Sequence, residues 1–194
     1  MEKFKKLAQT KLTESIQVKE SILSNEDLLE NMRLVAEKII STFQQNGRVY
    51  FCGNGGSAAD AQHIAAEFTG RFYKDRAPLY AEAFHVNTSF ITAVANDYSY
   101  DEIYSRLAQA KMDEKSILVG FSTSGNSTNI IKAFEYCRSK NFTTIGFTGE
   151  SGGKIKELSD ILINIPSNDT PRIQEAHITV AHIICEYVEN VLFP

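Results

Sequence analysis

The sequence predicts an α/β fold, a three-layer sandwich around a mostly parallel five-stranded sheet, with helices ahead of the sheet. From residue 48 onward, short apolar segments alternate with amphipathic ones, a pattern typical of a parallel sheet covered by helices on both faces. Two of the apolar segments run into turns of small residues, as strands of open α/β sheets do beside a ligand crevice. The 194 residues contain no linker or repeat, so one domain is expected.

The first 47 residues predict two helices. Residues 3–23 are strongly charged and carry only a sparse apolar stripe. The second helix begins at residues 24–27 (SNED), a capping residue followed by acidic first-turn residues, and ends at Gly47. Its apolar residues recur near helical spacing at Leu28, Met32, Val35, Ile39 and Phe43. A minimal sheet domain has no obvious place for two such helices, so we expect them to pack on something beyond it, such as a second subunit.

The remainder of the chain alternates between strands and helices. We expect strands at residues 48–52, 80–84, 116–121, 143–148 and 160–165. We expect helices at residues 58–69, 88–96, 100–110, 127–139, 153–159 and 171–192. The single domain would then span residues 1–194, with N-terminal helices over 1–47 and the α/β core over 48–194.

The composition excludes several classes of function. The chain is 43% hydrophobic and 23% charged, as in soluble globular proteins, and its net charge of −4 disfavours nucleic acid as a partner. No apolar stretch is long enough to span a membrane, and no apolar secretory segment follows Met1. The three cysteines include no CxxC pair, so we expect reduced thiols and a cytoplasmic protein. Cys52 lies beside a glycine turn, where a nucleophile is one interpretation and a small apolar strand residue the favoured one.

Two turns of small and polar residues follow predicted strands. One covers residues 53–57 (GNGGS), and the other covers residues 122–128 (STSGNST). Free backbone N–H groups and the positive end of a helix attract anions at such turns. The second turn has no lysine and is no P-loop, but its neutral hydroxyls suit a phosphomonoester that is held and then released. Either turn alone is equally well an ordinary loop with a serine N-cap; the pair favours a phosphate site.

The helix after the first turn carries candidate acid/base or metal-binding residues. Asp60, His63 and Glu67 lie within one narrow stripe of this helix, at about 100° per residue. His63 and Glu67 are spaced i, i+4, so their side chains can meet or bind one metal ion. Most isolated pairs of this kind belong to a solvated polar face, but their position beside the proposed ligand turn favours a site.

The last predicted helix adds two candidates, Gln174 and His182. They lie about 80° apart on the helical wheel, with Ile178 and Cys185 between them, off the main apolar face. That apolar face comprises Ile173, Ala176, Val180, Ile183, Ile184, Tyr187 and Val191. A surface helix is more polar beside its apolar face, so we expect the second face to be buried too, with Gln174 and His182 toward a pocket or an interface. The alternative for His182 is a hydrogen-bonded core histidine.

Two further histidines and one polar pair are less informative. His85 and His177 have no clear polar constellation around them, and we expect core histidines. Asn96 and Asp97 end the helix after the second strand. They fit a turn, because Asn and Asp favour turns, and equally a contact with sugar hydroxyls at the crevice.

A series of short motifs runs along the chain. They are CGNGGS at 52–57, HIAAEFTGRF at 63–72, AND at 95–97, STSGNS at 122–127, TG at 148–149, and RIQEAH at 172–177 with His182. In this order they resemble the sedoheptulose-7-phosphate isomerase (phosphoheptose isomerase) family, which has the flavodoxin-like sugar isomerase (SIS) fold. The serine turn alone marks only the SIS fold, whereas its combination with HxxxE and with Gln174 and His182 is much more specific.

The resemblance implies a reaction and roles for individual residues. The reaction converts D-sedoheptulose 7-phosphate to D-glycero-D-manno-heptose 7-phosphate, the first step toward activated heptoses of lipopolysaccharide or capsule. Glu67 and His182 would be the acid/base pair. The phosphate would be held by Ser122, Thr123, Ser124 and Ser127, and the sugar would contact Asn54, Gly55, Gly56, Ser57, Glu67, Asn96, Asp97 and Gln174.

The resemblance also implies a metal ion and an assembly. Members of the family can bind zinc through residues matching His63, Glu67, Gln174 and His182, either as a Lewis acid or only to stabilise the site. A homotetramer with active sites completed at subunit interfaces is expected. Some members have an acidic residue before the arginine of RIQE; Pro171 stands there in this chain, so the role of that acid cannot be carried over.

Two other interpretations compete with an enzyme. One is a non-enzymatic SIS protein resembling the DnaA initiator-associating protein, which lacks the HxxxE acid/base residues. The other is a SIS-type regulator, which commonly carries a DNA-binding domain for which this chain has no room. The presence of His63, Glu67 and His182 favours the isomerase.

Overall fold

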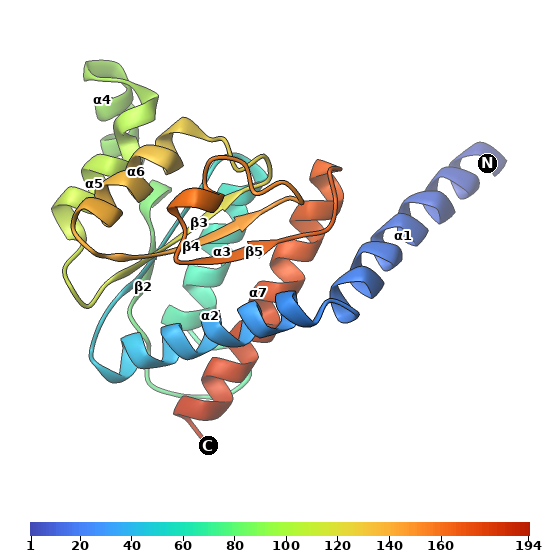
Figure 1. Cartoon of the computed structure of the whole chain (residues 1–194), viewed down its shortest axis with the longest axis horizontal. Coiled ribbons are helices and arrows are strands. Elements are labelled where there is room, and N and C mark those ends of the chain that lie inside the picture. Colours follow the sequence, from blue (N-terminus) through green and yellow to red (C-terminus); the bar gives the residue numbers. More distant parts are fainter.

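The computed structural model describes residues 1–194 and contains a single sheet between layers of helices (Figure 1). Its strands are β1 (Val49–Gly53), β2 (Ala81–Ala83), β3 (Ile117–Ser122), β4 (Thr143–Thr148) and β5 (Ile161–Asn164). All neighbouring strands are parallel, in the order β2-β1-β3-β4-β5. This is the flavodoxin-like order, whose ligand crevice opens where the strand order reverses, between β1 and β3. The predicted fold class is confirmed, with an entirely parallel sheet.

The helices agree with the predicted order. They are α1 (Glu2–Leu23), α2 (Glu26–Gln44), α3 (Gly56–Thr69), α4 (Thr88–Asp97), α5 (Ile103–Lys111), α6 (Thr128–Ser139) and α7 (Thr170–Leu192). The helix predicted at 153–159 was wrong: only a 3-10 turn forms at Lys156–Leu158. The preceding Gly152 and Gly153 have positive φ angles, and so few residues cannot offset the cost of starting an α-helix.

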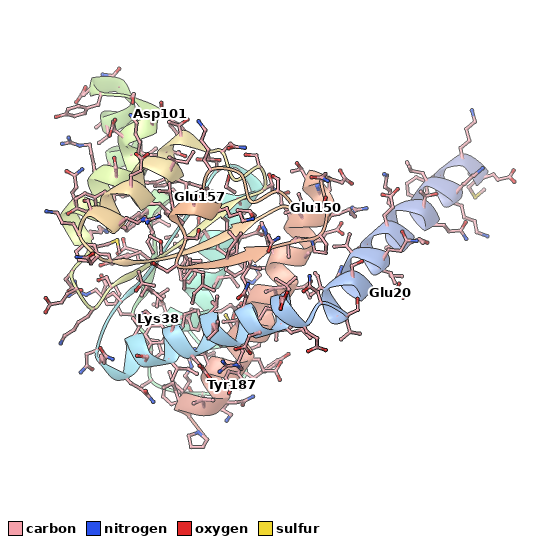
Figure 2. The ribbon with its side chains drawn as sticks, viewed as in Figure 1. Glu20, Lys38, Asp101, Glu150, Glu157 and Tyr187 are labelled. Atoms are coloured by element: carbon pink, nitrogen blue, oxygen red, sulfur yellow. The ribbon has the colours of Figure 1, made fainter.

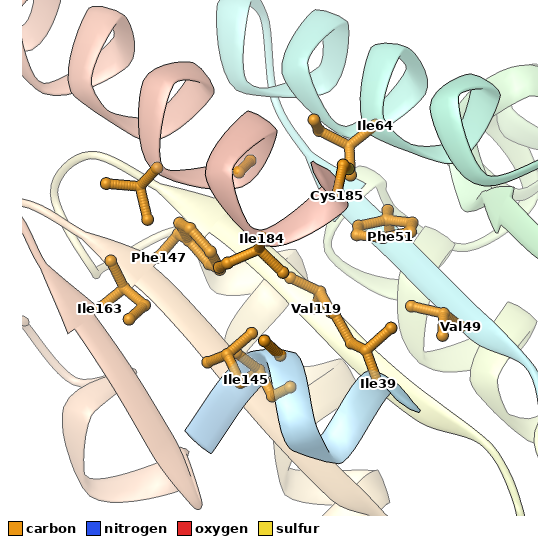
Figure 3. Packing of buried hydrophobic residues seen from close by; sticks show 14 of the residues in the cluster. Ile39, Val49, Phe51, Ile64, Val119, Ile145, Phe147, Ile163, Ile184 and Cys185 are labelled. Carbon is orange, nitrogen blue, oxygen red and sulfur yellow. The ribbon is translucent and has the colours of Figure 1, made fainter. Parts of the chain in front are cut away.

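Alternate residues of the central strands point to opposite faces of the sheet, and both faces are buried. On one face, α2, α3 and α7 cover the strands. Figure 3 shows Ile39, Ile64, Ile184 and Cys185 of these helices over Val49, Phe51, Val119, Ile145, Phe147 and Ile163 of the sheet. On the other face, Tyr50, Cys52 and Leu118 pack against α5 and α6. Cys52 lies in β1 and is fully buried, as expected for a strand residue, and burial raises the pKa of its thiol well above the usual value, which disfavours a nucleophile.

The two N-terminal helices differ in how they are covered. α2 packs on the sheet through buried residues such as Leu28 and Val35, so the expectation that both helices pack on something beyond the sheet domain was wrong for α2. α1 projects away from the rest of the chain (Figure 1) and buries only Ile22. Its side chains stand out along its length (Figure 2), and Phe4 is 75% exposed. No helix of the protein combines the length and the apolar character that crossing a membrane requires.

Candidate active site

The glycine turn joins β1 to α3 at the carboxyl edge of the sheet. Gly55 begins α3 as its N-cap with a φ of 57°, a backbone conformation that favours glycine. A Cβ atom at Gly56 would lie 2.5 Å from Nε2 of Gln174, so α7 reaches the turn here and a side chain at Gly56 would displace the Gln174 amide. Ser57 is buried. The structure therefore brings together Gly56 and Gln174, which are far apart in the sequence.

The serine turn joins β3 to α6 along the same edge of the sheet. The hydroxyls of Ser122 and Ser127 lie 2.8 Å apart. Ser124 is exposed, and its hydroxyl accepts a hydrogen bond from the Asn126 amide at 3.1 Å. Ser127 is the N-cap of α6 and makes no side-chain bond to the helix. The hydroxyls thus gather at the positive end of α6, where an anionic group is stabilised.

The loop after β4 supports the serine turn through close backbone contacts. The amide of Gly149 donates to the carbonyl of Thr123 at 2.9 Å. Gly125 has a φ of 64°, and a Cβ atom there would lie 2.0 Å from the carbonyl oxygen of Gly152. The loop after β4 therefore packs directly against the turn, and Gly125 is needed both for its conformation and for this close approach.

A pair of asparagines links the two turns. Each amide of Asn54 and Asn129 donates to the other's oxygen at 2.9 Å. The Tyr100 hydroxyl also donates to Oδ1 of Asn54, at 3.0 Å, and the Tyr104 hydroxyl donates to the carbonyl of Gly53. Asn129, Tyr100 and Tyr104 were not among the residues predicted from the sequence. Their partners lie far away along the chain, although the position of Asn129 directly after the serine motif was an available signal.

His63, Glu67 and His182 form a compact cluster between α3 and α7. Nε2 of His63 lies 3.0 Å from Oε1 of Glu67 and 3.4 Å from Nε2 of His182. One ligand atom from each residue lies within 4.8 Å of the other two. The meeting of His63 and Glu67 that their spacing predicts is observed, and His182 of the same chain lies beside them. Two imidazole nitrogens and a carboxylate oxygen are donors that suit zinc, so the residues present fit that ion.

Burial, more than the neighbouring charges, favours a neutral His182. Burial lowers the pKa of His182, and His63 lowers it further, while Glu67 opposes them. Burial also raises the pKa of Asp60 to about 6 against the opposing effect of His63, and its Oδ2 is buried without a hydrogen-bond partner. Asp60 thus shares the stripe of His63 and Glu67 without joining their hydrogen bonds.

The other predicted residues have varied placements. Asn96 and Asp97 are exposed in the last turn of α4, and their side chains bond to each other at 2.9 Å. His177 is a core histidine as expected, because it is fully buried and its Nε2 lies 3.0 Å from the carbonyl of Thr148. The expectation for His85 was wrong: this residue is only partly buried, and its Nδ1 has no partner.

α7 confirms one expectation and corrects another. Its second face is buried, since Cys185 is 1% exposed and Ile178 packs against the core. The main apolar face is covered only in part, because Ile183, Tyr187 and Val191 are exposed. Figure 2 shows Tyr187 standing at the outer side of α7, below α2. Ile183 and Tyr187 border a largely apolar groove between α2 and α7 that also includes Leu29, Met32 and Ala36.

Several known proteins are similar to this chain in both sequence and architecture. The family profile of the SIS domain matches residues 14–149. A phosphoheptose isomerase from Aneurinibacillus thermoaerophilus is 51% identical over 179 residues, which cover 92% of this chain and 90% of that protein. The solved structure of phosphoheptose isomerase GmhA from Neisseria gonorrhoeae superposes with a TM-score of 0.90 at 37% identity, over 96% of this chain and 99% of that one. A phosphoheptose isomerase from Francisella tularensis superposes with a TM-score of 0.92 at 31% identity, over 98% and 100% of the two chains. The chain belongs to the phosphoheptose isomerase family of SIS-domain proteins.

Proposed function

We propose that the protein is an aldose–ketose isomerase that converts D-sedoheptulose 7-phosphate to D-glycero-D-manno-heptose 7-phosphate. The observation that carries this proposal is the meeting of Glu67 and His182 across α3 and α7, at helices that also contact the glycine turn. A sugar phosphate isomerase needs a phosphate site and, at a distance from it, an acid/base pair. The serine turn and the cluster of His63, Glu67 and His182 supply these two parts from separate segments of the chain.

The chemistry assigns a distinct task to each acid/base residue. Ketose–aldose isomerisation can proceed through a cis-enediol, in which one base moves a proton between neighbouring carbons. Glu67 would take the proton from C1 of the ketose and return it to C2. His182, which is favoured in its neutral form, would move a proton from O1 to O2. His63 lies within hydrogen-bond distance of the Glu67 carboxylate and would hold it in place.

The serine turn would act through binding. Ser122, Thr123, Ser124 and Ser127 would hold the phosphate at the positive end of α6. The phosphate is remote from C1 and C2, so its binding energy orients the sugar for proton transfer rather than taking part in the chemistry. The asparagine pair between the turns would keep the phosphate site and the sugar site in register.

Zinc is a proposed component of this site. His63, Glu67 and His182 would hold the ion, with Gln174 as the fourth ligand suggested by the resemblance. Bound zinc would supply a Lewis acid that polarises substrate oxygens, or would only stabilise the site. A zinc-bound Glu67 would be a weaker base. Whether Glu67 can still accept a proton with zinc bound therefore decides whether the ion takes part in the reaction or only stabilises the site.

Assembly into a homotetramer is also proposed. The exposed apolar residues of α1 and the groove between α2 and α7 favour self-association, because apolar surfaces of this kind mark contact sites. Light scattering should give four times the mass of the 21.7 kDa chain. A fully active monomer at assay concentration would contradict the proposal.

We further propose a cytoplasmic location and a role in supplying heptose for lipopolysaccharide or capsule.

One experiment tests the reaction directly. The protein is incubated with sedoheptulose 7-phosphate, and NMR follows the appearance of aldose signals. Conversion supports the isomerase. A protein that binds the sugar phosphate without converting it, with or without added zinc, would instead support the non-enzymatic SIS interpretation. The convergence of His63, Glu67 and His182 favours conversion.

A further inference from the structure

A buried ion pair lies just beyond the acid/base cluster. It joins Arg76, in the segment between α3 and β2, to Glu189, near the end of α7. Nε of Arg76 lies 2.9 Å from Oε1 of Glu189, and the two side chains are only 2% and 3% exposed. Removing two charges from water is costly unless further hydrogen bonds satisfy both groups. The partners of each residue therefore indicate what this pair does.

Glu189 holds the segment that follows α3. Its carboxylate accepts hydrogen bonds from the backbone amides of Phe72, Tyr73 and Lys74 at 3.0, 2.7 and 2.9 Å. Burial by itself raises the pKa of Glu189, but these three amides and Arg76 together lower it, so the group stays ionised. Consecutive amides that converge on one buried carboxylate fix the path of the segment relative to α7.

Arg76 holds the end of α3. Its guanidinium donates to the backbone carbonyls of Glu67 and Phe68, both at 2.8 Å, and to that of Ala77 at 3.1 Å. The carbonyls in the last turn of a helix lack helical partners and carry partial negative charge, which a cation stabilises. Arg76 therefore connects the backbone of Glu67 directly to the side chain of Glu189.

This pair forms the third link between α3 and α7. The first is the contact of Gln174 with Gly56, and the second is the approach of His182 to His63. Glu189 follows His182 by seven residues, which places both on one stripe of α7. In addition, the ring of Phe72 lies 5.6 Å from the ring of His182, measured between centroids.

We propose that Arg76 and Glu189 are positioning residues for the isomerase reaction, which set the separation of Glu67 and His182 and hold Phe72 against His182. The inference rests on the proposed acid/base roles of Glu67 and His182. Neither Arg76 nor Glu189 touches the reacting atoms. Their effect arises because a displacement of about 1 Å in reacting groups can lower a rate about 100-fold.

The test replaces Glu189 with glutamine and compares it with a matched control. Glu189→Gln keeps the size of the side chain but turns an amide group toward backbone N–H donors. The control is Asp160→Asn, because Asp160 also accepts a hydrogen bond from a backbone amide, that of Thr144 at 2.8 Å, at the opposite edge of the sheet. We expect Glu189→Gln to lower kcat about 10- to 100-fold with KM for sedoheptulose 7-phosphate almost unchanged. Asp160→Asn should change neither value, even where thermal stability falls equally.

A second measurement does not depend on activity. The chain has four histidines, so the imidazole NMR signals of His182 in metal-free protein can be assigned by comparison with His182→Gln. Glu189→Gln should shift the His182 signals and leave those of His177 in place, whereas Asp160→Asn should shift neither. If the wild-type protein fails to convert the sugar but Glu189→Gln still shifts these signals, the proposed function is wrong and the positioning geometry stands.

Two results would overturn the inference. One is a kcat for Glu189→Gln no lower than that of Asp160→Asn, with or without a change in the His182 signals. The other is an unchanged His182 environment despite a lower kcat. Should Glu189→Gln not fold, Arg76→Lys is judged by the same two measurements, because lysine keeps the positive charge but cannot reach Glu67, Phe68 and Glu189 together.

Discussion

The serine turn and the cluster of His63, Glu67 and His182 are built in opposite ways. The turn is local, since its hydroxyls come from the contiguous residues 122–128 between β3 and α6. The cluster is assembled by packing, because His63 and His182 are 119 residues apart in the chain. Small shifts between helices therefore leave the hydroxyls of the serine turn in place relative to one another. The cluster of His63, Glu67 and His182 keeps its geometry only while α3 and α7 keep a fixed separation.

Loss of the base should give the largest effect. Glu67→Gln should lower kcat by about 10²- to 10⁴-fold, the usual contribution of a positioned acid/base group. The fold should remain, because the Glu67 side chain is partly exposed and glutamine has nearly the same size. Steady-state kinetics at controlled zinc concentration provides the measurement. Glu186→Gln, on the exposed side of α7, is the matched control, and equal rates for the two variants would reject Glu67 as the base.

A histidine outside the site should respond to pH rather than to substrate. Burial lowers the pKa of His177 to about 4, below the unfolded value of about 6.5. The unfolded chain then binds the extra proton first, so the stability contributed by neutral His177 is complete above pH 6.5 and is lost as the pH falls toward 4. The loss should total about 3 kcal/mol.

Chemical denaturation across that pH range measures this loss. His177→Phe should flatten the slope of stability against pH between 4 and 6.5, whereas His85→Gln should leave most of it. An unchanged slope in His177→Phe would show that other groups cause the acid sensitivity. His182 lies five residues further along the same helix. Unlike His177, which lies in the core, His182 belongs to the site.

The serine turn should affect binding more than stability. Ser124→Ala should weaken sugar phosphate binding by about 1.5–3 kcal/mol, the value of a hydrogen bond to a charged group, with little change in Tm. Calorimetric titration of the substrate into protein checks this. Ser139→Ala, at the other end of α6, is the control and should bind normally. Equal affinity in both variants would remove Ser124 from the phosphate site.

The link between the two turns should have the smallest effect. Asn129→Leu breaks the reciprocal amide bonds and leaves Nδ2 of Asn54 without its acceptor, at a cost of about 1–3 kcal/mol in stability. KM should rise modestly because the turns lose their common register. Asn141→Gly is the surface control. Asn141 has a positive φ, a backbone conformation that glycine adopts without strain. A stability equal to that of wild type would contradict the proposed link.

Local patterns explain what could be predicted from the sequence. The strand expected at 116–121 is observed at Ile117–Ser122, because an apolar run bounded by turns has one stable environment, the centre of a parallel sheet. The serine turn and the His63–Glu67 pair were equally accessible, since both follow from short-range spacing. His182 was expected beside His63 and Glu67 only through the resemblance to a known family, and the sequence did not indicate that all three meet within one chain.

The remaining features depend on contacts that no local pattern carries. Arg76 and Glu189 are separated by 113 residues, and each alone is an ordinary surface residue by type. The same holds for the asparagine pair, whose members are 75 residues apart. The helix expected at 153–159 is absent for a local reason. The positive φ angles of Gly152 and Gly153 outweighed a weak helical pattern.

One comparison tests most directly whether Glu67 acts in catalysis and the serine turn in phosphate binding. Sedoheptulose 7-phosphate is titrated into Glu67→Gln and Ser124→Ala, and conversion is followed by NMR in the same samples. We expect Glu67→Gln to bind the sugar phosphate with near wild-type affinity without converting it, and Ser124→Ala to bind it weakly but convert it at high concentration. Conversion by Glu67→Gln at the wild-type rate, or equal loss of binding in both variants, would contradict the account.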